Sequence, residues 1–212
     1  MVMSMGDDGK EKGRGDGFGP AGGPVVVPRP PTVRVIIVAE SPSPSLIPIY
    51  KVSRTFDEES ARRMIFAAGE PGRLLVRVQR FLREMWDAQE DEKMAQLHKL
   101  FRYGHLIYLS PSPQDEGRDG GKDTVRAEVD ALLEEGVQGI VALGDVAKNW
   151  VRTNYPPEGL LFVFLPQPSN HVSSWFPSYL ERTGRERGTD ALAIRDAMAV
   201  QIDKLVRLCT AL

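Results

Sequence analysis

The 212-residue sequence contains a single cysteine, Cys209, close to its C-terminal end. One cysteine cannot form an intramolecular disulfide, and it cannot supply the thiolate ligands of a zinc or iron–sulfur site. Scarcity of cysteine fits a reducing compartment, so we expect a cytoplasmic protein, or a nuclear one in a eukaryote. The sequence also lacks the His and carboxylate spacings typical of metal ligands, and we expect no metal ion or other cofactor.

Long apolar runs are missing as well. No stretch approaches the roughly 20 residues of a membrane-spanning helix, and the Gly-rich N-terminus has no apolar signal-peptide core. No Gly-x-Gly-x-x-Gly follows the first apolar segment, and no P-loop pattern occurs. These absences argue against a membrane protein, a dinucleotide enzyme and a nucleoside triphosphatase.

The net charge of −2 lacks the positive excess of most nucleic-acid-binding proteins, so a DNA partner would require a local basic patch. Residues 1–31 are rich in Gly, Pro and charged residues, and their few apolar groups cannot offset the entropy lost on ordering. We therefore predict a flexible arm over 1–31 and one domain over 32–212, which is long enough for a sizeable core.

Four apolar segments rich in β-branched and aromatic residues predict buried strands, at residues 33–39, 105–109, 139–143 and 160–165. Helical periodicity predicts helices at residues 57–68, 74–86, 91–101, 123–135, 145–151 and 189–208, with breaks at Gly69–Gly72 and at the prolines of 40–45. Strands that alternate with helices pair in parallel through right-handed crossovers. The predicted fold class is therefore α/β, a four-stranded parallel sheet flanked by helices on both faces.

Proline-containing polar loops follow three of the four predicted strands, at residues 40–45, 110–113 and 166–171. Open parallel sheets bind ligands beyond the carboxyl ends of their strands, so we predict that these loops form one site. The candidate residues are Ala39, Glu40, Ser41, Pro42, Ser43, Tyr50, Ser110, Gln167, Pro168, Ser169, Asn170 and His171.

The chemistry of these side chains suits cleavage of a glycosidic bond. A carboxylate such as Glu40 orients water or stabilises an oxocarbenium-like transition state. The amides, hydroxyl and imidazole of residues 167–171 suit a base edge, a phosphate or a leaving anion. The same residue types also suit purely structural roles, in which Glu40 bonds to local backbone and Ser169 and Asn170 close a proline turn.

The two loops carry a family resemblance. Residues 39–43, Ala-Glu-Ser-Pro-Ser, resemble the first motif of the uracil-DNA glycosylase superfamily, which reads Gly-Glu-Ala-Pro-Gly in one branch. Residues 166–170, Pro-Gln-Pro-Ser-Asn, resemble the second motif, usually His-Pro-Ser and Asn-Pro-Ser in the mismatch-specific branch. Residues 140–144, Ile-Val-Ala-Leu-Gly, are similar to the third strand of the superfamily. The resemblance covers residues 33–176 and implies a four-stranded parallel sheet between helices.

The resemblance also implies roles for individual residues. Glu40 matches the glutamate that positions water or supports the sugar cation, and Ser41 stands where other branches carry a water-activating Asp or Asn. Gln167 replaces the His or Asn that stabilises the departing base. Ser169 matches a serine that grips phosphate, and Tyr50 is expected to stack under the extruded base.

Three functions remain open. The first is a monofunctional, metal-independent DNA base-excision glycosylase that flips a deaminated or mismatched base, uracil first, out of duplex or single-stranded DNA and hydrolyses its N-glycosidic bond. The second is an inactive member of the same fold that binds nucleic acid or protein, which the replacements at Ser41 and Gln167 favour. The third is an unrelated α/β hydrolase of free nucleosides or sugar phosphates, which the near-neutral charge favours.

Overall fold

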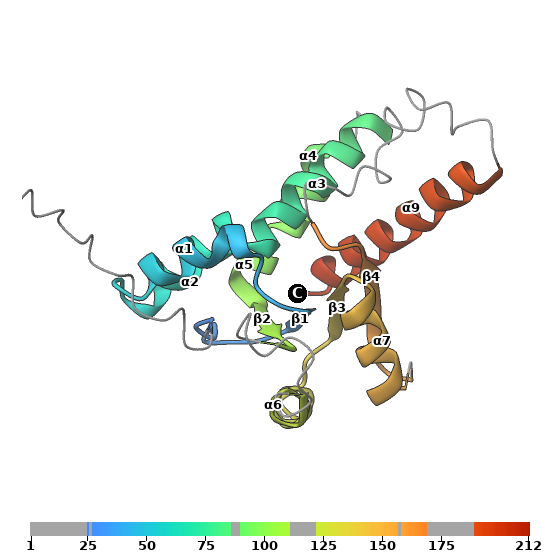
Figure 1. The fold of residues 1–212 in the computed structure, drawn as a ribbon. Coiled ribbons are helices and arrows are strands. Elements are labelled where there is room, and N and C mark those ends of the chain that lie inside the picture. Colours follow the sequence, from blue (N-terminus) through green and yellow to red (C-terminus); the bar gives the residue numbers. More distant parts are fainter. Residues whose placement is uncertain (1–24, 26, 86–89, 111–121, 157, 169–188) are drawn as a thin grey trace, which may run out of the picture.

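A computed structural model describes residues 25, 27–85, 90–110, 122–156, 158–168 and 189–212 (Figure 1). They form an α/β fold around a sheet of four parallel strands. The strands are β1 (Val35–Ala39), β2 (Gly104–Tyr108), β3 (Gly139–Leu143) and β4 (Leu161–Leu165). The predicted fold class is confirmed, and each strand overlaps a predicted apolar segment.

The helical elements are η1 (Pro44–Leu46), α1 (Ile47–Ser53), α2 (Glu58–Ala68), α3 (Glu70–Met85), α4 (Glu90–Leu97), α5 (Leu100–Tyr103), α6 (Lys122–Glu134), α7 (Asp145–Asn154) and α9 (Thr189–Thr210). None of the helices among the described residues combines the length and apolar character that crossing a membrane requires.

The strand order is β2-β1-β3-β4. The chain goes from β1 to β2 on one side and then crosses back over β1 to β3, so its direction reverses between β1 and β3. Such a switch point is where open α/β sheets form their binding crevice. In register, Ala39 lies between Tyr108 and Leu143, and Leu143 lies beside Leu165. The last residues of all four strands therefore form a single row across the sheet.

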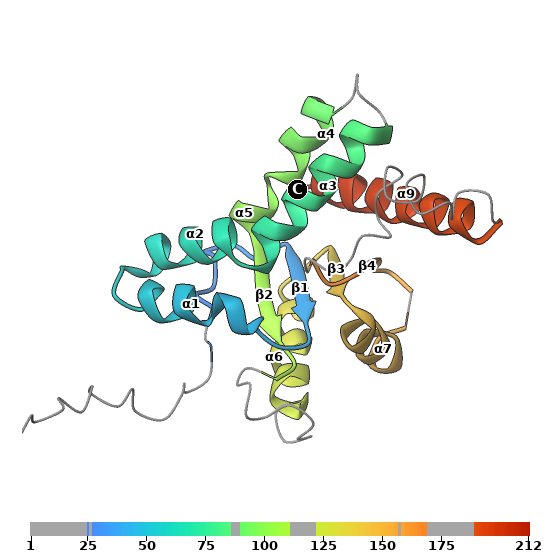
Figure 2. The same ribbon diagram turned by 45° about the horizontal axis from the view of Figure 1, so that its top comes forward.

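Helices cover both faces of the sheet (Figures 1 and 2). Val35, Ile37 and Ala39 belong to the core shared with α1 to α4 and α9, whereas Ile36 and Val38 belong to the core shared with α6 and α7. All five residues of β1 are fully buried. Burial on both sides explains why the strands read as continuous apolar runs rather than as alternating ones.

Two predicted proline and glycine breaks are wrong in extent. Pro44 and Ser45 belong to η1, which leads directly into α1, a helix that was not predicted. The break at Gly69–Gly72 shrinks to Gly69, since α3 already begins at Glu70. Residues in the first turn of a helix do not use their N–H groups in helical hydrogen bonds, so proline, which has no N–H, fits there. The prolines therefore begin these helices instead of excluding them. The predicted helix over 91–101 is also divided into α4 and α5.

The last part of the predicted arm packs on the domain. Val25 and Val27 are only 9% and 7% exposed and belong to the core, and Arg29 forms an ion pair with Glu135. These three residues of the predicted arm therefore contact the domain. Residues 1–24, for which the arm was also predicted, lie outside the described residues.

Candidate functional site

The loops after the four strands meet at the carboxyl edge of the sheet and are tied together in pairs. The N–H of Ser110 donates to the carbonyl oxygen of Glu40 at 2.8 Å, which joins the loops after β2 and β1. The N–H of Gly144 donates to the carbonyl oxygen of Leu165 at 2.8 Å, which joins the ends of β3 and β4. The strand order thus puts Glu40 on one side of the switch point and Gln167 on the other.

Gly144 follows β3, the strand that lies between β1 and β4, and it lies close to Gln167. Strands β1 and β4 are separated by β3, so the strand ends that lead into Glu40 and Gln167 lie two strand spacings apart, about 10 Å. Gly144 adopts φ +87°, a left-handed conformation that strains residues with a Cβ. The position that a Cβ would take at Gly144 lies 3.5 Å from the Cβ of Gln167. A glycine therefore shapes the turn after β3 and leaves the space beside Gln167 without a side chain of its own.

A hollow of about 430 Å³ opens beside Gln167, a volume typical of small-ligand sites. It is lined by Gly144, Asp145, Lys148, Phe164, Leu165, Pro166, Gln167 and Met198. The ammonium of Lys148 lies 3.6 Å from the carboxylate of Asp145, so the positive charge at this hollow is partly balanced. Glu40 is not among the lining residues, and the hollow belongs to the β3–β4 side of the edge.

The predicted site residues divide by exposure. Side chains that reach solvent are those of Glu40, Ser41, Ser43 and Gln167, all half-buried. Ala39, Pro42, Ser110 and Pro168 are buried and shape the loops. The predictions for Ser169, Asn170 and His171 lie outside the described residues.

A buried carboxyl group that the sequence-based prediction missed supports the Glu40 loop. Glu70, the first residue of α3, is 2% exposed. The hydroxyls of Tyr50 and Tyr108 both donate to its Oε2, and the N–H of Ser43 donates to its Oε1 at 3.0 Å. Burial and the neighbouring Glu70 carboxyl group raise the pKa of each tyrosine, so both phenols stay protonated and act as donors.

This cluster of Glu70, Tyr50 and Tyr108 fixes the loop that carries Glu40, because Ser43 lies three residues beyond Glu40 in the same loop. Nothing in the sequence marks it, since Glu70 is 20 and 38 residues from the two tyrosines. Tyr50 is 2% exposed and meets the ring of Tyr108 edge-on, with the centroids 6.1 Å apart. Its predicted stacking role stays a prediction, and it requires the ring to become accessible.

No protein-family model matches the chain, and a search of curated proteins found no match either. The resemblance to uracil-DNA glycosylases therefore rests on the motifs of residues 39–43, 140–144 and 166–170. Within the part of the chain that the structure describes, no three His, Cys, Asp or Glu side chains gather closely enough to hold a metal ion.

Proposed function

We propose that this chain is a DNA glycosylase-like hydrolase that cleaves the N-glycosidic bond of a base flipped out of DNA. One observation supports the proposal: Glu40 follows β1 and Gln167 follows β4, on either side of β3 and Gly144 at the switch point of a parallel sheet, and two strand spacings amount to about 10 Å. A nucleoside placed over Gly144 would have the carboxylate toward its sugar and the amide toward its base.

The two side chains suit the two halves of the reaction. As the C1′–N bond breaks, its electron pair leaves with the base, and the positive charge that develops on the sugar lies near the Glu40 carboxylate. The oxygen of a water molecule then bonds to C1′, and Glu40 accepts the proton that this water loses. The Gln167 amide donates a hydrogen bond to the oxygen of the departing base, where negative charge develops.

The support around these groups limits their motion. The Ser43 N–H is anchored to buried Glu70, and the Glu40 carbonyl is bonded to Ser110. The Gln167 loop rests on Gly144. Groups held in advance in the productive geometry lower the barrier without reorganising during the reaction.

A base-release assay tests the proposal. The full chain is incubated with duplex and single-stranded oligonucleotides that carry uracil, hypoxanthine or mismatched thymine, and alkali then reveals abasic sites. We expect Glu40→Gln to slow release by at least about 100-fold, because it removes the proton acceptor. The matched control Glu134→Gln changes an exposed glutamate on α6 and should behave as wild type.

A specific observation also favours a second function. Ser41 stands where related motifs carry a water-activating group, and Gln167 cannot become a cation as histidine does. An inactive member of this fold would bind DNA without releasing a base. Release of no base, together with binding that weakens steeply with salt, would replace the first proposal by this one. Cleavage of free nucleosides but not of oligonucleotides would point to the third function instead.

A further inference from the structure

A second hollow, of about 400 Å³, lies at the opposite edge of the sheet. Thr32 and Tyr103, which line it, come just before β1 and β2, so it opens at the amino edge, away from Glu40 and Gln167. The full lining is Arg29, Pro31, Thr32, Glu58, Glu59, Arg62, Arg102 and Tyr103. Three arginines and two glutamates thus surround a cavity that the proposed function does not use.

Arg62 is buried without a carboxylate partner. It is 8% exposed, it donates a hydrogen bond to the carbonyl oxygen of Phe101, and it lies over the ring of Phe66. Among the described residues no carboxylate forms an ion pair with it, since the neighbouring Glu59 pairs with Arg63. A guanidinium carries five N–H donors, and burying its charge without a counter-ion is costly. An anion in the hollow would supply that counter-ion.

Burial disfavours the charged form of the Arg62 guanidinium. It lowers the pKa of Arg62, an effect that Glu59 opposes and Arg63 reinforces. Glu59 is therefore the negative charge that acts on the Arg62 guanidinium, although its carboxylate forms its ion pair with Arg63.

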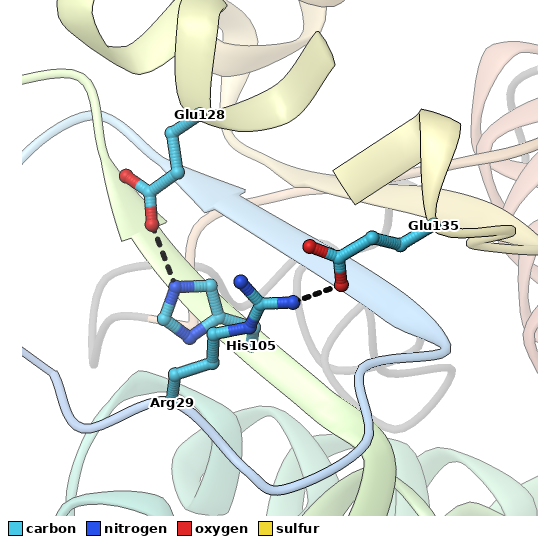
Figure 3. Close-up of polar contacts among 4 residues, drawn as sticks. All are labelled: Arg29, His105, Glu128 and Glu135. Carbon is cyan, nitrogen blue, oxygen red and sulfur yellow. Dashed lines mark hydrogen bonds and ion pairs between the residues drawn. The ribbon is translucent and has the colours of Figure 1, made fainter. Parts of the chain in front are cut away.

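Arg102 supplies a second guanidinium. It is exposed and stacks on the ring of Tyr103, with its Cζ 5.1 Å from the centroid, and it has no ion pair within the described ranges. Stacking holds the planar head in one orientation against the wall of the hollow. Arg29 is different, because Glu135 already pairs with it (Figure 3). Arg62 and Arg102 thus line the hollow together with Thr32, and neither forms an ion pair among the described residues.

We propose that the amino-edge hollow binds a phosphate dianion, either inorganic phosphate or the phosphate of a small phosphorylated molecule. Two guanidinium forks match the oxygens and the double charge of a phosphate, whereas a carboxylate would satisfy only one. Exposed Glu58 also lines the hollow, and its carboxylate can accept hydrogen bonds from the hydroxyls of an attached sugar.

Titration calorimetry on the full chain at low ionic strength tests this site with three probes: inorganic phosphate, a nucleoside 5′-monophosphate and the same nucleoside without phosphate. We expect the first two to bind and the nucleoside not to bind. A monophosphate that binds at least about tenfold more tightly than phosphate identifies a phosphorylated small molecule as the ligand, through added contacts with groups such as Glu58. Equal affinities identify inorganic phosphate.

Variants assign the binding to this hollow. Arg102→Gln should weaken phosphate binding at least about tenfold, since it removes a charge-assisted hydrogen bond. Arg152→Gln is the matched control, because Arg152 is also exposed and stacked, 4.9 Å from the centroid of Phe164 on another part of the surface. Lys148→Gln controls for the hollow at the carboxyl edge. Both controls should bind phosphate as wild type does.

Arg62→Lys keeps the charge and removes the fork, and it should also weaken binding. If circular dichroism shows that this buried variant does not fold, Arg102→Gln decides the question. No binding of phosphate at millimolar concentration, or an unchanged affinity of Arg102→Gln, would overturn the proposal. Loss of binding in Lys148→Gln alone would overturn it too. The outcome is independent of base release, which uses the other edge of the sheet.

Discussion

Strand β2 carries two buried polar side chains that differ in how they are satisfied. Tyr108, at its carboxyl end, faces the core of α3 and joins Tyr50 and Ser43 around Glu70, which is 2% exposed. His105, three residues earlier, points to the opposite face, where its Nε2 lies 2.8 Å from a carboxylate oxygen of Glu128 on α6 (Figure 3).

The cluster around Glu70 is closed, whereas the pair of His105 and Glu128 is open. Glu70 receives three donors, but the buried Nδ1 of His105 has no partner in the part of the chain that the structure describes, and the Glu128 side chain is 45% exposed. A closed buried network fixes the geometry around it, and a half-satisfied one contributes little net stability. The closed cluster is the one that holds the Glu40 loop.

The largest effect is expected from Glu70→Met. Methionine fills a similar volume but accepts no strong hydrogen bond, so two phenols and the N–H of Ser43 lose their acceptor. We expect the free energy of unfolding to fall by about 3 kcal/mol, measured by urea denaturation. Glu70→Gln keeps one carbonyl acceptor and should lose less. A loss below about 1 kcal/mol for the methionine variant would show that the cluster is not closed.

Tyr108→Phe should cost about 1.5 kcal/mol at pH 7, because it removes one of the three donors to Glu70. It should also change the alkaline behaviour. In wild type the raised pKa of Tyr108 keeps the folded phenol protonated, while the unfolded one ionises near the ordinary tyrosine pKa of 10.0. Above that pH the unfolded state binds fewer protons, so wild-type stability declines as pH rises.

The variant lacks this titration, so its free energy of unfolding should fall less steeply than that of wild type above pH 10. Urea denaturation between pH 7 and pH 11 checks both parts. Tyr103→Phe, at a half-buried tyrosine outside the cluster, is the control and should keep the wild-type slope. Parallel curves for Tyr108→Phe and wild type would contradict the assignment.

His105→Leu tests the pair of His105 and Glu128, in which the hydrogen bonds are only partly satisfied. The change removes one hydrogen bond but also removes the buried Nδ1 that lacks a partner. These effects oppose each other, so the free energy of unfolding at pH 7 should change by less than about 1 kcal/mol. Glu128→Gln serves as the partner control, with an equally small effect. A loss of unfolding free energy close to that of Glu70→Met would show that the two clusters contribute equally to stability.

The smallest effect is expected at the pair of Arg29 and Glu135, which are about half exposed. Glu135→Gln should lower the free energy of unfolding by about 0.5 kcal/mol or less, because solvent and salt screen exposed ion pairs. The difference from wild type should vanish in denaturation experiments at 1 M salt. A difference that persists there would mean that this contact to the chain before β1 is more than a surface pair.

Much of the fold follows from local patterns, but the supports of the site do not. The apolar run of residues 33–39 predicted β1, and the proline loops after the strands placed Glu40 and Gln167 at one edge. Helix α1 was missed because the prolines of residues 40–45 were taken as a break, although Pro44 lies in the first turn of η1, which leads directly into α1. Glu70 was assigned to a break for the same reason, and its partners come from three other elements.

The sequence by itself therefore determined the four strands and most of the helices, because periodicity and β-branched content act over a few neighbouring residues. It also determined the parallel class, since helices between strands allow only crossover connections. Only the tertiary structure decided the order β2-β1-β3-β4, the closeness of Gly144 to Gln167, and the partners of Glu70, Arg62 and His105. These depend on which helix packs on which face, a choice made by the whole core at once and not by any segment of it.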